Sequence, residues 1–145
     1  MSRHLKTERM VEKVLVAIDG SSKAREALEF ALREFEGTET TVIYVVDSGN
    51  YSEGLPIDPM SEEQQAHVSN VLSDAENFAE EQDGEIETIY RIGEPWREIV
   101  AHAEEEQFDH IVVGSRGMTG VKRILLGSVA EGVVRYSPVP VTVVR

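Results

Sequence analysis

The sequence predicts a single-domain α/β protein with an open, five-stranded parallel sheet and helices on both of its faces. Short apolar runs alternate along the chain with segments whose apolar residues recur at helical spacing. Most of the apolar runs lack polar alternation, as expected for parallel strands that are covered on both faces. With 145 residues, the chain can form one compact core, and no linker, repeat or low-complexity segment divides it.

The expected elements alternate strictly, which predicts parallel pairing with right-handed crossovers. The segments that resemble strands are 14–18, 41–46, 86–92, 110–113 and 141–144. The segments that resemble helices are 24–35, 61–79, 95–103 and 128–136. Polar residues alternate with apolar ones in the third strand, so we expect it at a half-exposed edge. Gly37 is expected to close the first helix, and Ser61 and Gln64 have the spacing of a capping box.

Composition and charge exclude several classes of protein. The 14 Lys and Arg residues against 27 Asp and Glu give a formal net charge of −13, which excludes a basic nucleic-acid footprint and disfavours an anionic membrane surface. The absence of cysteine excludes disulfides and Cys-ligated metals. No apolar run approaches the ~20 residues of a transmembrane helix, and the polar residues 1–10 do not resemble a signal peptide. We therefore expect a cytoplasmic protein that binds neither nucleic acid nor membranes.

The cations are mostly arginine, with ten Arg and four Lys beside 21 Glu. An acidic, lysine-poor surface suits a cytoplasm of high salt, because charge repulsion is screened within ~3 Å at about 1 M salt. We therefore hypothesise a salt-adapted source, with an ordinary acidic protein as the alternative.

The loop over residues 114–128 is the best candidate for a ligand site. Open α/β sheets bind ligands beyond the carboxyl ends of their strands, where the strand order reverses. Four glycines in this loop allow close backbone approach and can aim amide groups at a phosphate. Residues 110–130 contain no acid, although Arg116, Lys122 and Arg123 lie among them. We therefore expect an anion here; the alternative is a solvent loop that lacks acids by chance.

The loop ends at Gly127 and Ser128, where a helix is expected to begin. A helix N-terminus offers unpaired N–H groups and the positive end of the helix dipole, and both attract an anion. Ser128 and Glu131 also have the spacing of a capping box, so the alternative role of the Ser128 hydroxyl is to cap the helix.

Several other kinds of site are excluded by their motifs. The chain has no P-loop sequence, and Asp19-Gly-Ser-Ser follows the first strand in place of a glycine-rich dinucleotide fingerprint. A phospho-receiver domain would need an acid at the end of the third strand and a lysine at the end of the fifth, where Arg91-Ile92 and Arg145 stand. The four histidines are scattered without metal-ligand spacing, so we expect them at the surface or in packing contacts.

The sequence resembles the universal stress protein family. The nucleotide signature of that family is Gly-x2-Gly-x9-Gly-Ser/Thr, and Gly114-x2-Gly117-x9-Gly127-Ser128 fits it without a gap. Three more segments resemble the opening strand with its acidic loop, the end of the second strand and the closing segment: 14–21, 44–47 and 137–144. The resemblance covers nearly the whole chain after residues 1–10, which are candidates for disorder.

The resemblance implies a sheet with strand order 3-2-1-4-5 that binds ATP or another adenine nucleotide, with Mg²⁺ held through the phosphates. In that order the reversal lies between strands one and four, beside the glycine-rich loop. By matched position, the residues implied to bind the nucleotide are Asp19, Val45, Gly114, Gly117, Gly127, Ser128 and Val129. Arg116 and Lys122 are our own additions, argued from charge alone.

The resemblance also implies which part of the nucleotide each residue contacts. Asp19 is implied near the ribose and phosphates, and the backbone of Val45 against the adenine. Gly114 and Gly117 are implied at the ribose-phosphate turn, and residues 127–129 at the phosphates. The alternative for Asp19 is a turn or cap residue, and the alternative for Val45 is a core valine.

The resemblance also implies a homodimer formed through the C-terminal strand, residues 139–145, whose valines would otherwise form an exposed apolar edge. We expect slow or no ATP hydrolysis, because Asp19 is the one carboxylate expected in the crevice. The expected function is an ATP-responsive stress sensor or survival factor. The alternatives are a family member that binds no nucleotide and acts through protein contacts, and an enzyme with an unidentified substrate.

Overall fold

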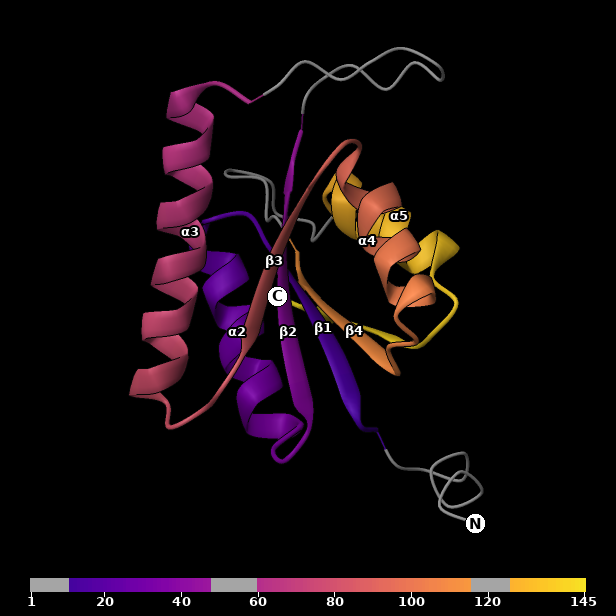
Figure 1. Cartoon of the computed structure of the whole chain (residues 1–145). Coiled ribbons are helices and arrows are strands. Elements are labelled where there is room, and N and C mark those ends of the chain that lie inside the picture. Colours follow the sequence, from indigo (N-terminus) through magenta and orange to yellow (C-terminus); the bar gives the residue numbers. More distant parts are fainter. Residues whose placement is uncertain (1–10, 48–59, 116–125) are drawn as a thin grey trace.

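Strands and helices alternate along the part of the chain that the computed structural model describes, residues 11–47, 60–115 and 126–145. The elements are β1 (Lys13–Ile18), α2 (Ser22–Glu34), β2 (Glu39–Val46), α3 (Glu62–Glu81), β3 (Glu87–Ile92), α4 (Pro95–Glu105), β4 (His110–Gly114), α5 (Ser128–Tyr136) and β5 (Val141–Val144). The strands form one five-stranded sheet in the order β3-β2-β1-β4-β5, and every pair is parallel. The predicted fold class and strand order are therefore confirmed (Figure 1).

Local sequence signals place several element ends correctly. The hydroxyl of Ser61 accepts a hydrogen bond from the N–H of Gln64 at 3.1 Å, and the Gln64 side chain accepts one from the N–H of Ser61 at 2.9 Å. This reciprocal pair confirms the predicted capping box of α3. After α2 ends, Gly37 adopts a φ of +86°, a conformation that glycine reaches without steric cost. No residue of β3 is fully buried, as expected for an edge strand.

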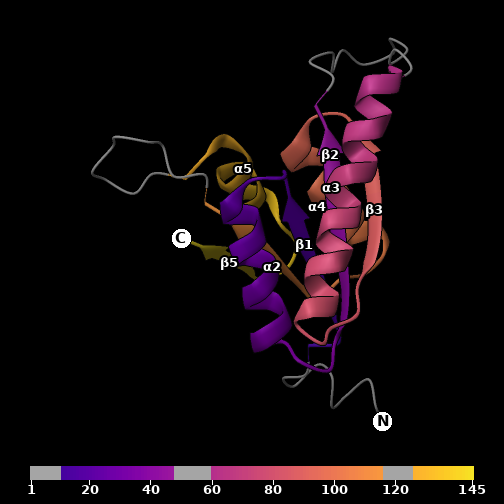
Figure 2. The same ribbon diagram turned by 90° about the vertical axis from the view of Figure 1, so that its left-hand side faces the viewer.

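The helices cover both faces of the sheet, with α2 and α3 on one side and α4 and α5 on the other (Figures 1 and 2). Successive residues of a strand point to opposite faces. Val14 and Val16 accordingly pack into the core beneath α2 and α3, whereas Leu15 and Ala17 pack into the core beneath α4 and α5. Burial on both faces explains why β1 is apolar throughout.

A space opens beyond the carboxyl ends of β1 and β4, because these neighbouring strands lead into α2 and α5 on opposite faces. The pairing between β1 and β2 ends at Ile18 and Tyr44. The pairing between β2 and β3 continues to Val46. Strand β2 therefore runs two residues past β1, and its edge at Val45 faces the space, whereas the carbonyl of Val46 bonds to Gly93 on the side of β3.

At the opposite end of the sheet, Asp109 joins β1 to β4. Its carboxylate accepts hydrogen bonds from the N–H groups of Glu12 and Lys13, each at 2.9 Å. Its own N–H donates to the carbonyl of Lys13 at 2.8 Å. These bonds link segments up to 97 residues apart in the sequence, and they fix the centre of the sheet at its amino end.

Strand β5 forms the second edge of the sheet, and within the described residues no strand pairs with its outer side. Its side chains are half-buried: Val141 and Val143 pack against one core and Val144 against the other. Strand β5 is therefore an edge strand of the single chain, and its valines are partly covered by the two cores rather than fully exposed. No helix in the described ranges has the length and apolar character needed to cross a membrane.

Candidate functional site

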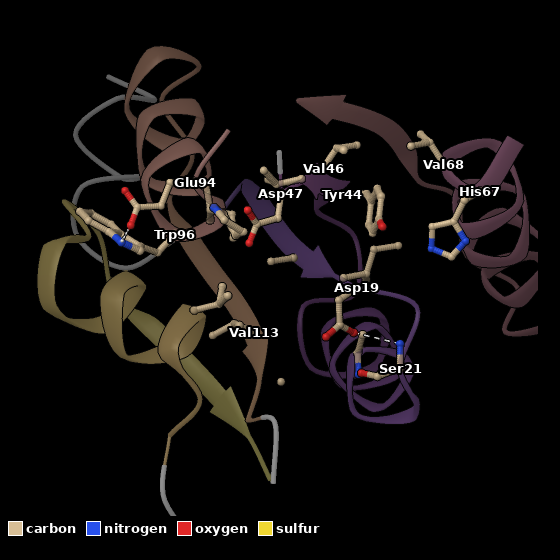
Figure 3. Close-up of a pocket in the computed structure, with 18 of the residues that line it drawn as sticks. Asp19, Ser21, Tyr44, Val46, Asp47, His67, Val68, Glu94, Trp96 and Val113 are labelled. Carbon is tan, nitrogen blue, oxygen red and sulfur yellow. Dashed lines mark hydrogen bonds between the residues drawn. The ribbon is translucent and has the colours of Figure 1, made fainter. Parts of the chain in front are cut away.

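A pocket of about 750 Å³ lies beyond the carboxyl ends of β1, β2 and β4, at the reversal of strand order (Figure 3). Its walls come from these strand ends, the first turns of α2, α4 and α5, and the N-terminal half of α3. Small-molecule sites usually measure about 300–1,000 Å³. The pocket thus lies where the sequence predicts a ligand site, and its volume falls in the usual range for such sites.

The pocket brings together residues that are far apart in the sequence. Five of the predicted site residues line it: Asp19, Val45, Gly114, Ser128 and Val129. Gly127 lies directly before Ser128, as the N-cap residue of α5. Gly117, Arg116 and Lys122 lie outside the described residues. Their predicted roles, like those of the lining residues, stay predictions.

Asp19 ends β1 and shapes the turn into α2. Its Oδ1 accepts a hydrogen bond from the N–H of Ser21 at 2.9 Å, which is an Asx-turn. Ser21 in turn caps α2, because its hydroxyl accepts from the N–H of Ala24 at 3.2 Å. The turn role offered as an alternative for Asp19 is therefore present, and the same side chain also lines the pocket.

Gly114 is a glycine for reasons of packing. A Cβ at this position would lie 2.7 Å from the carbonyl oxygen of Lys23 and 2.9 Å from its carbonyl carbon. Both atoms belong to the backbone of the first turn of α2, which cannot turn aside as a side chain can. The end of β4 thus passes so close to α2 that a side chain finds no room, whatever the ligand in the pocket.

The first turn of α5 faces the pocket without a side-chain cap. The N-cap residue is Gly127, with φ −66° and ψ 165°, and it has no side chain to accept a hydrogen bond. The capping role offered as an alternative for Ser128 is therefore wrong, since Ser128 lies one residue inside the helix. Its backbone N–H is among the orphan donors of a helix N-terminus, which favour an anion. By contrast, serines cap both α2 and α3.

The pocket holds more acids than the sequence predicted. Asp47, Glu63 and Glu94 line it beside Asp19, so the expectation of a single carboxylate is wrong. Their positions contained a partial signal, because Asp47 directly follows β2 and Glu94 comes two residues after β3. Across the described residues, no group of three or more His, Asp or Glu side chains is arranged to hold a metal ion. Lys23 supplies a positive charge to the lining.

Aromatic side chains on two sides of the pocket also escaped prediction. The rings of Tyr44 and His67 meet edge to face with centroids 5.9 Å apart, and Trp96 lies on the other side (Figure 3). Burial, with a further contribution from the charge of Asp19, raises the pKa of Tyr44 above 10.0. The phenol is therefore neutral near pH 7 and can donate a hydrogen bond. For Tyr44, its place beside Val45 at the strand end was an available signal.

Residues 10–145 match the universal stress protein family. The chain belongs to this family. As a universal stress protein, it is 37% identical over 148 aligned residues to universal stress protein YxiE of Bacillus subtilis strain 168, covering 94% of this chain and 100% of the relative. Among solved structures, it resembles universal stress protein UspA from Lactobacillus plantarum with a TM-score of 0.77 and 26% identity, over 94% of this chain and 99% of that one.

Two further solved structures of universal stress proteins share the fold and contain a nucleotide. One, from Archaeoglobus fulgidus, contains dAMP and has a TM-score of 0.71. The other contains cAMP and has a TM-score of 0.70. Each is 24% identical to this universal stress protein, and each match covers 94% of this chain and 98% of the other.

Proposed function

We propose that this universal stress protein binds ATP or another adenine nucleotide in the pocket beyond β1, β2 and β4, and that the bound state serves a cytoplasmic stress response as a sensor or survival factor. The observation that carries the proposal is the uncapped first turn of α5, which opens into a pocket of ligand size at the strand-order reversal. The dAMP and cAMP complexes seen in two solved structures with this fold support the class of ligand.

The geometry suggests how each end of a nucleotide is held. The open edge of β2 at Val45 would offer backbone groups to the edge of a base, while the side chain of Val45 packs against the core. The carbonyl of Val46 is already used, since it accepts from the N–H of Gly93 at 2.9 Å. The N–H groups at Gly127, Ser128 and Val129 would receive a phosphate. Asp19 lies at the end of β1, between these two regions in the strand order.

The acids of the pocket support a role for a cation. Asp19, Asp47, Glu63 and Glu94 line the pocket, and an anionic nucleotide placed near them is repelled. Mg²⁺ bound through the phosphates reduces this repulsion. It would enter with the nucleotide, since the described residues form no metal-binding cluster of their own. We also propose slow or no hydrolysis. Carboxylates and a cation are not sufficient for phosphoryl transfer, which needs a positioned water and groups that neutralise the charge on the γ-phosphate.

The direct test is chromatography of what the purified protein releases on denaturation, followed by calorimetric titration of the stripped protein with Mg-ATP at low and molar salt. Released or saturably bound adenine nucleotide supports the proposal. If no nucleotide is released and no heat is observed at either salt concentration, the proposal is wrong, and a role through protein contacts takes its place.

The Gly127→Val variant tests the site itself. Its backbone conformation, φ −66° and ψ 165°, lies in the extended region that valine adopts readily. We therefore expect the fold to persist, with the unfolding free energy lowered by about 1 kcal/mol because valine is a poorer N-cap residue than glycine. A Cβ would intrude where the phosphate approaches the backbone, so nucleotide binding should be lost. Unchanged ATP affinity in the folded variant contradicts the assignment.

We also propose a homodimer through the C-terminal segment 139–145. The supporting observation is the outer side of β5, an edge strand whose backbone is open to pairing. Light scattering at working salt measures the mass of the particle in solution. A mass of one chain rather than two refutes the dimer.

A further inference from the structure

Trp96, the single tryptophan of the chain, is held firmly between α4 and α5. Its Nε1–H donates to Glu94 Oε2 at 3.1 Å (Figure 3). Its ring stacks on Tyr136 of α5 with centroids 4.6 Å apart and planes at 21°. The guanidinium of Arg97 lies over the indole, with its Cζ 4.9 Å from the ring centroid. Three contacts of different kinds therefore restrict movement of the indole.

Gly132 of α5 lies against this indole more closely than any other residue type allows. A Cβ on Gly132 would overlap Trp96 Cγ and lie 2.7 Å from Trp96 Cβ and 2.8 Å from Cδ1. Glycine in a helix interior lowers helix stability relative to alanine. Close packing against Trp96 explains the glycine where helix propensity does not.

The same helix supplies part of the pocket wall. Ser128 and Val129 line the pocket, and Ser128 lies four residues before Gly132, about one helical turn away. The contact between Trp96 and Gly132 therefore sets how closely α5 approaches α4 at the level of its first turn. We propose that Trp96 and Gly132 form a positioning pair that places this first turn for the phosphate of the nucleotide, an inference that rests on the proposed function.

The Gly132→Ala variant disturbs the pair directly. Ordinary contact begins at 3.4 Å, so relief of the 2.7 Å approach moves α5 or the indole by at least about 0.7 Å. Glu94 and Arg97 hold the indole on the side of α4, whereas Tyr136 belongs to α5 itself. We therefore expect α5 to move together with Tyr136 and to take Ser128 with it. A misplacement of about 1 Å can cost ~100-fold in a catalytic rate, and hydrogen bonds from helix amides to a phosphate likewise weaken as the distance and angle depart from ideal. We therefore expect Mg-ATP affinity to weaken about tenfold or more.

A double-mutant cycle with Trp96→Ala separates this pair from a general loss of packing. Removing the indole makes room for the Cβ, so Gly132→Ala should change Mg-ATP affinity by less than about twofold in the Trp96→Ala background. Gly84→Ala is the matched control, because its Cβ would meet the flexible end of Leu32, Cδ2 at 2.9 Å, far from the pocket residues. We expect Gly84→Ala to leave the affinity unchanged.

A second measurement does not depend on the nucleotide. The N–H of Glu131 donates to the carbonyl of Gly127 at 2.9 Å in the first turn of α5. Amide hydrogen exchange at Glu131 should accelerate in Gly132→Ala, and the acceleration should vanish in the Trp96→Ala background. Gly132→Ala retains the tryptophan, so a shift of its fluorescence emission reports the same displacement if the Trp96→Ala background does not fold.

The outcomes separate the two proposals. If Gly132→Ala binds Mg-ATP as tightly as the native chain and Glu131 exchanges at the native rate, the positioning pair is refuted and the nucleotide site stands. If the native chain binds no nucleotide, the proposed function fails. In that case, exchange that is coupled between positions 96 and 132 still supports the placement of α5, and uncoupled exchange refutes it.

Discussion

Replacement of Gly114 by alanine should destabilise the protein through a steric clash between β4 and α2. The added Cβ would lie 2.7 Å from the carbonyl oxygen of Lys23, so the two backbones must separate by at least about 0.7 Å to reach the 3.4 Å of ordinary contact. Overpacking of this kind costs about 1–3 kcal/mol. For a chain of this length, ~2–4 °C is lost per kcal/mol, so the thermal midpoint should fall by about 2–12 °C.

The assay is thermal unfolding of the nucleotide-free protein, followed by circular dichroism. Gly84→Ala is the control, because the atom nearest to its Cβ is the movable end of Leu32. We expect a smaller change there. A Gly114→Ala midpoint equal to that of the native chain would show that α2 and β4 are not in tight contact. In that case, the glycine would need another explanation, and nucleotide binding would be the first to test.

Three more predictions concern the helix caps, the ionisation of His110 and the effect of salt on stability. In urea titrations, Ser61→Ala should lower the free energy of unfolding by about 1 kcal/mol, because it removes a formed capping box. Ser128→Ala removes no cap and should lower it by less than about 0.5 kcal/mol. Burial lowers the pKa of His110 below 6.5, so the unfolded chain takes up a proton first and the unfolding free energy falls as the pH drops below about 6.5. His110→Gln should flatten this pH dependence relative to the native chain, and equal slopes would contradict it. If the protein is salt-adapted, its thermal midpoint should rise between low and molar KCl, and a constant midpoint argues for an ordinary acidic protein.

The fold was predictable because hydrophobic patterns extend over only a few residues: most strands are short continuous apolar runs, and the helices repeat their apolar residues at helical spacing. The first and last residues of the strands and helices were harder to predict. Strand β2 begins at Glu39, two residues earlier than predicted, because the N–H of Glu39 donates to the carbonyl of Glu12 at 2.8 Å. That bond depends on a neighbouring strand and leaves no trace in the local sequence.

The site was predictable where it follows from strand ends. Asp19 and Val45 lie at the ends of β1 and β2, and the pocket includes both. Both Ser61 and Ser128 are followed three residues later by a Gln or a Glu, which is the spacing of a capping box. Of these two serines, only Ser61 caps its helix. The spacing cannot show which residue leaves the helical conformation. The fit between Trp96 and Gly132 joins two helices, and the spacing of residues within either helix does not reveal it.

The bonds of Asp109 bear on how the chain is made. During synthesis, β1 leaves the ribosome long before β4, which lies about 97 residues later by the span of these bonds. At ~5–20 residues per second, β1 waits about 5–20 s for this neighbour. Strands β2 and β3 can join β1 in the meantime, since they follow it directly in sequence and in the sheet. The other edge of β1 stays open in that interval, so the nascent chain is most prone to aggregation through this edge until β4 arrives.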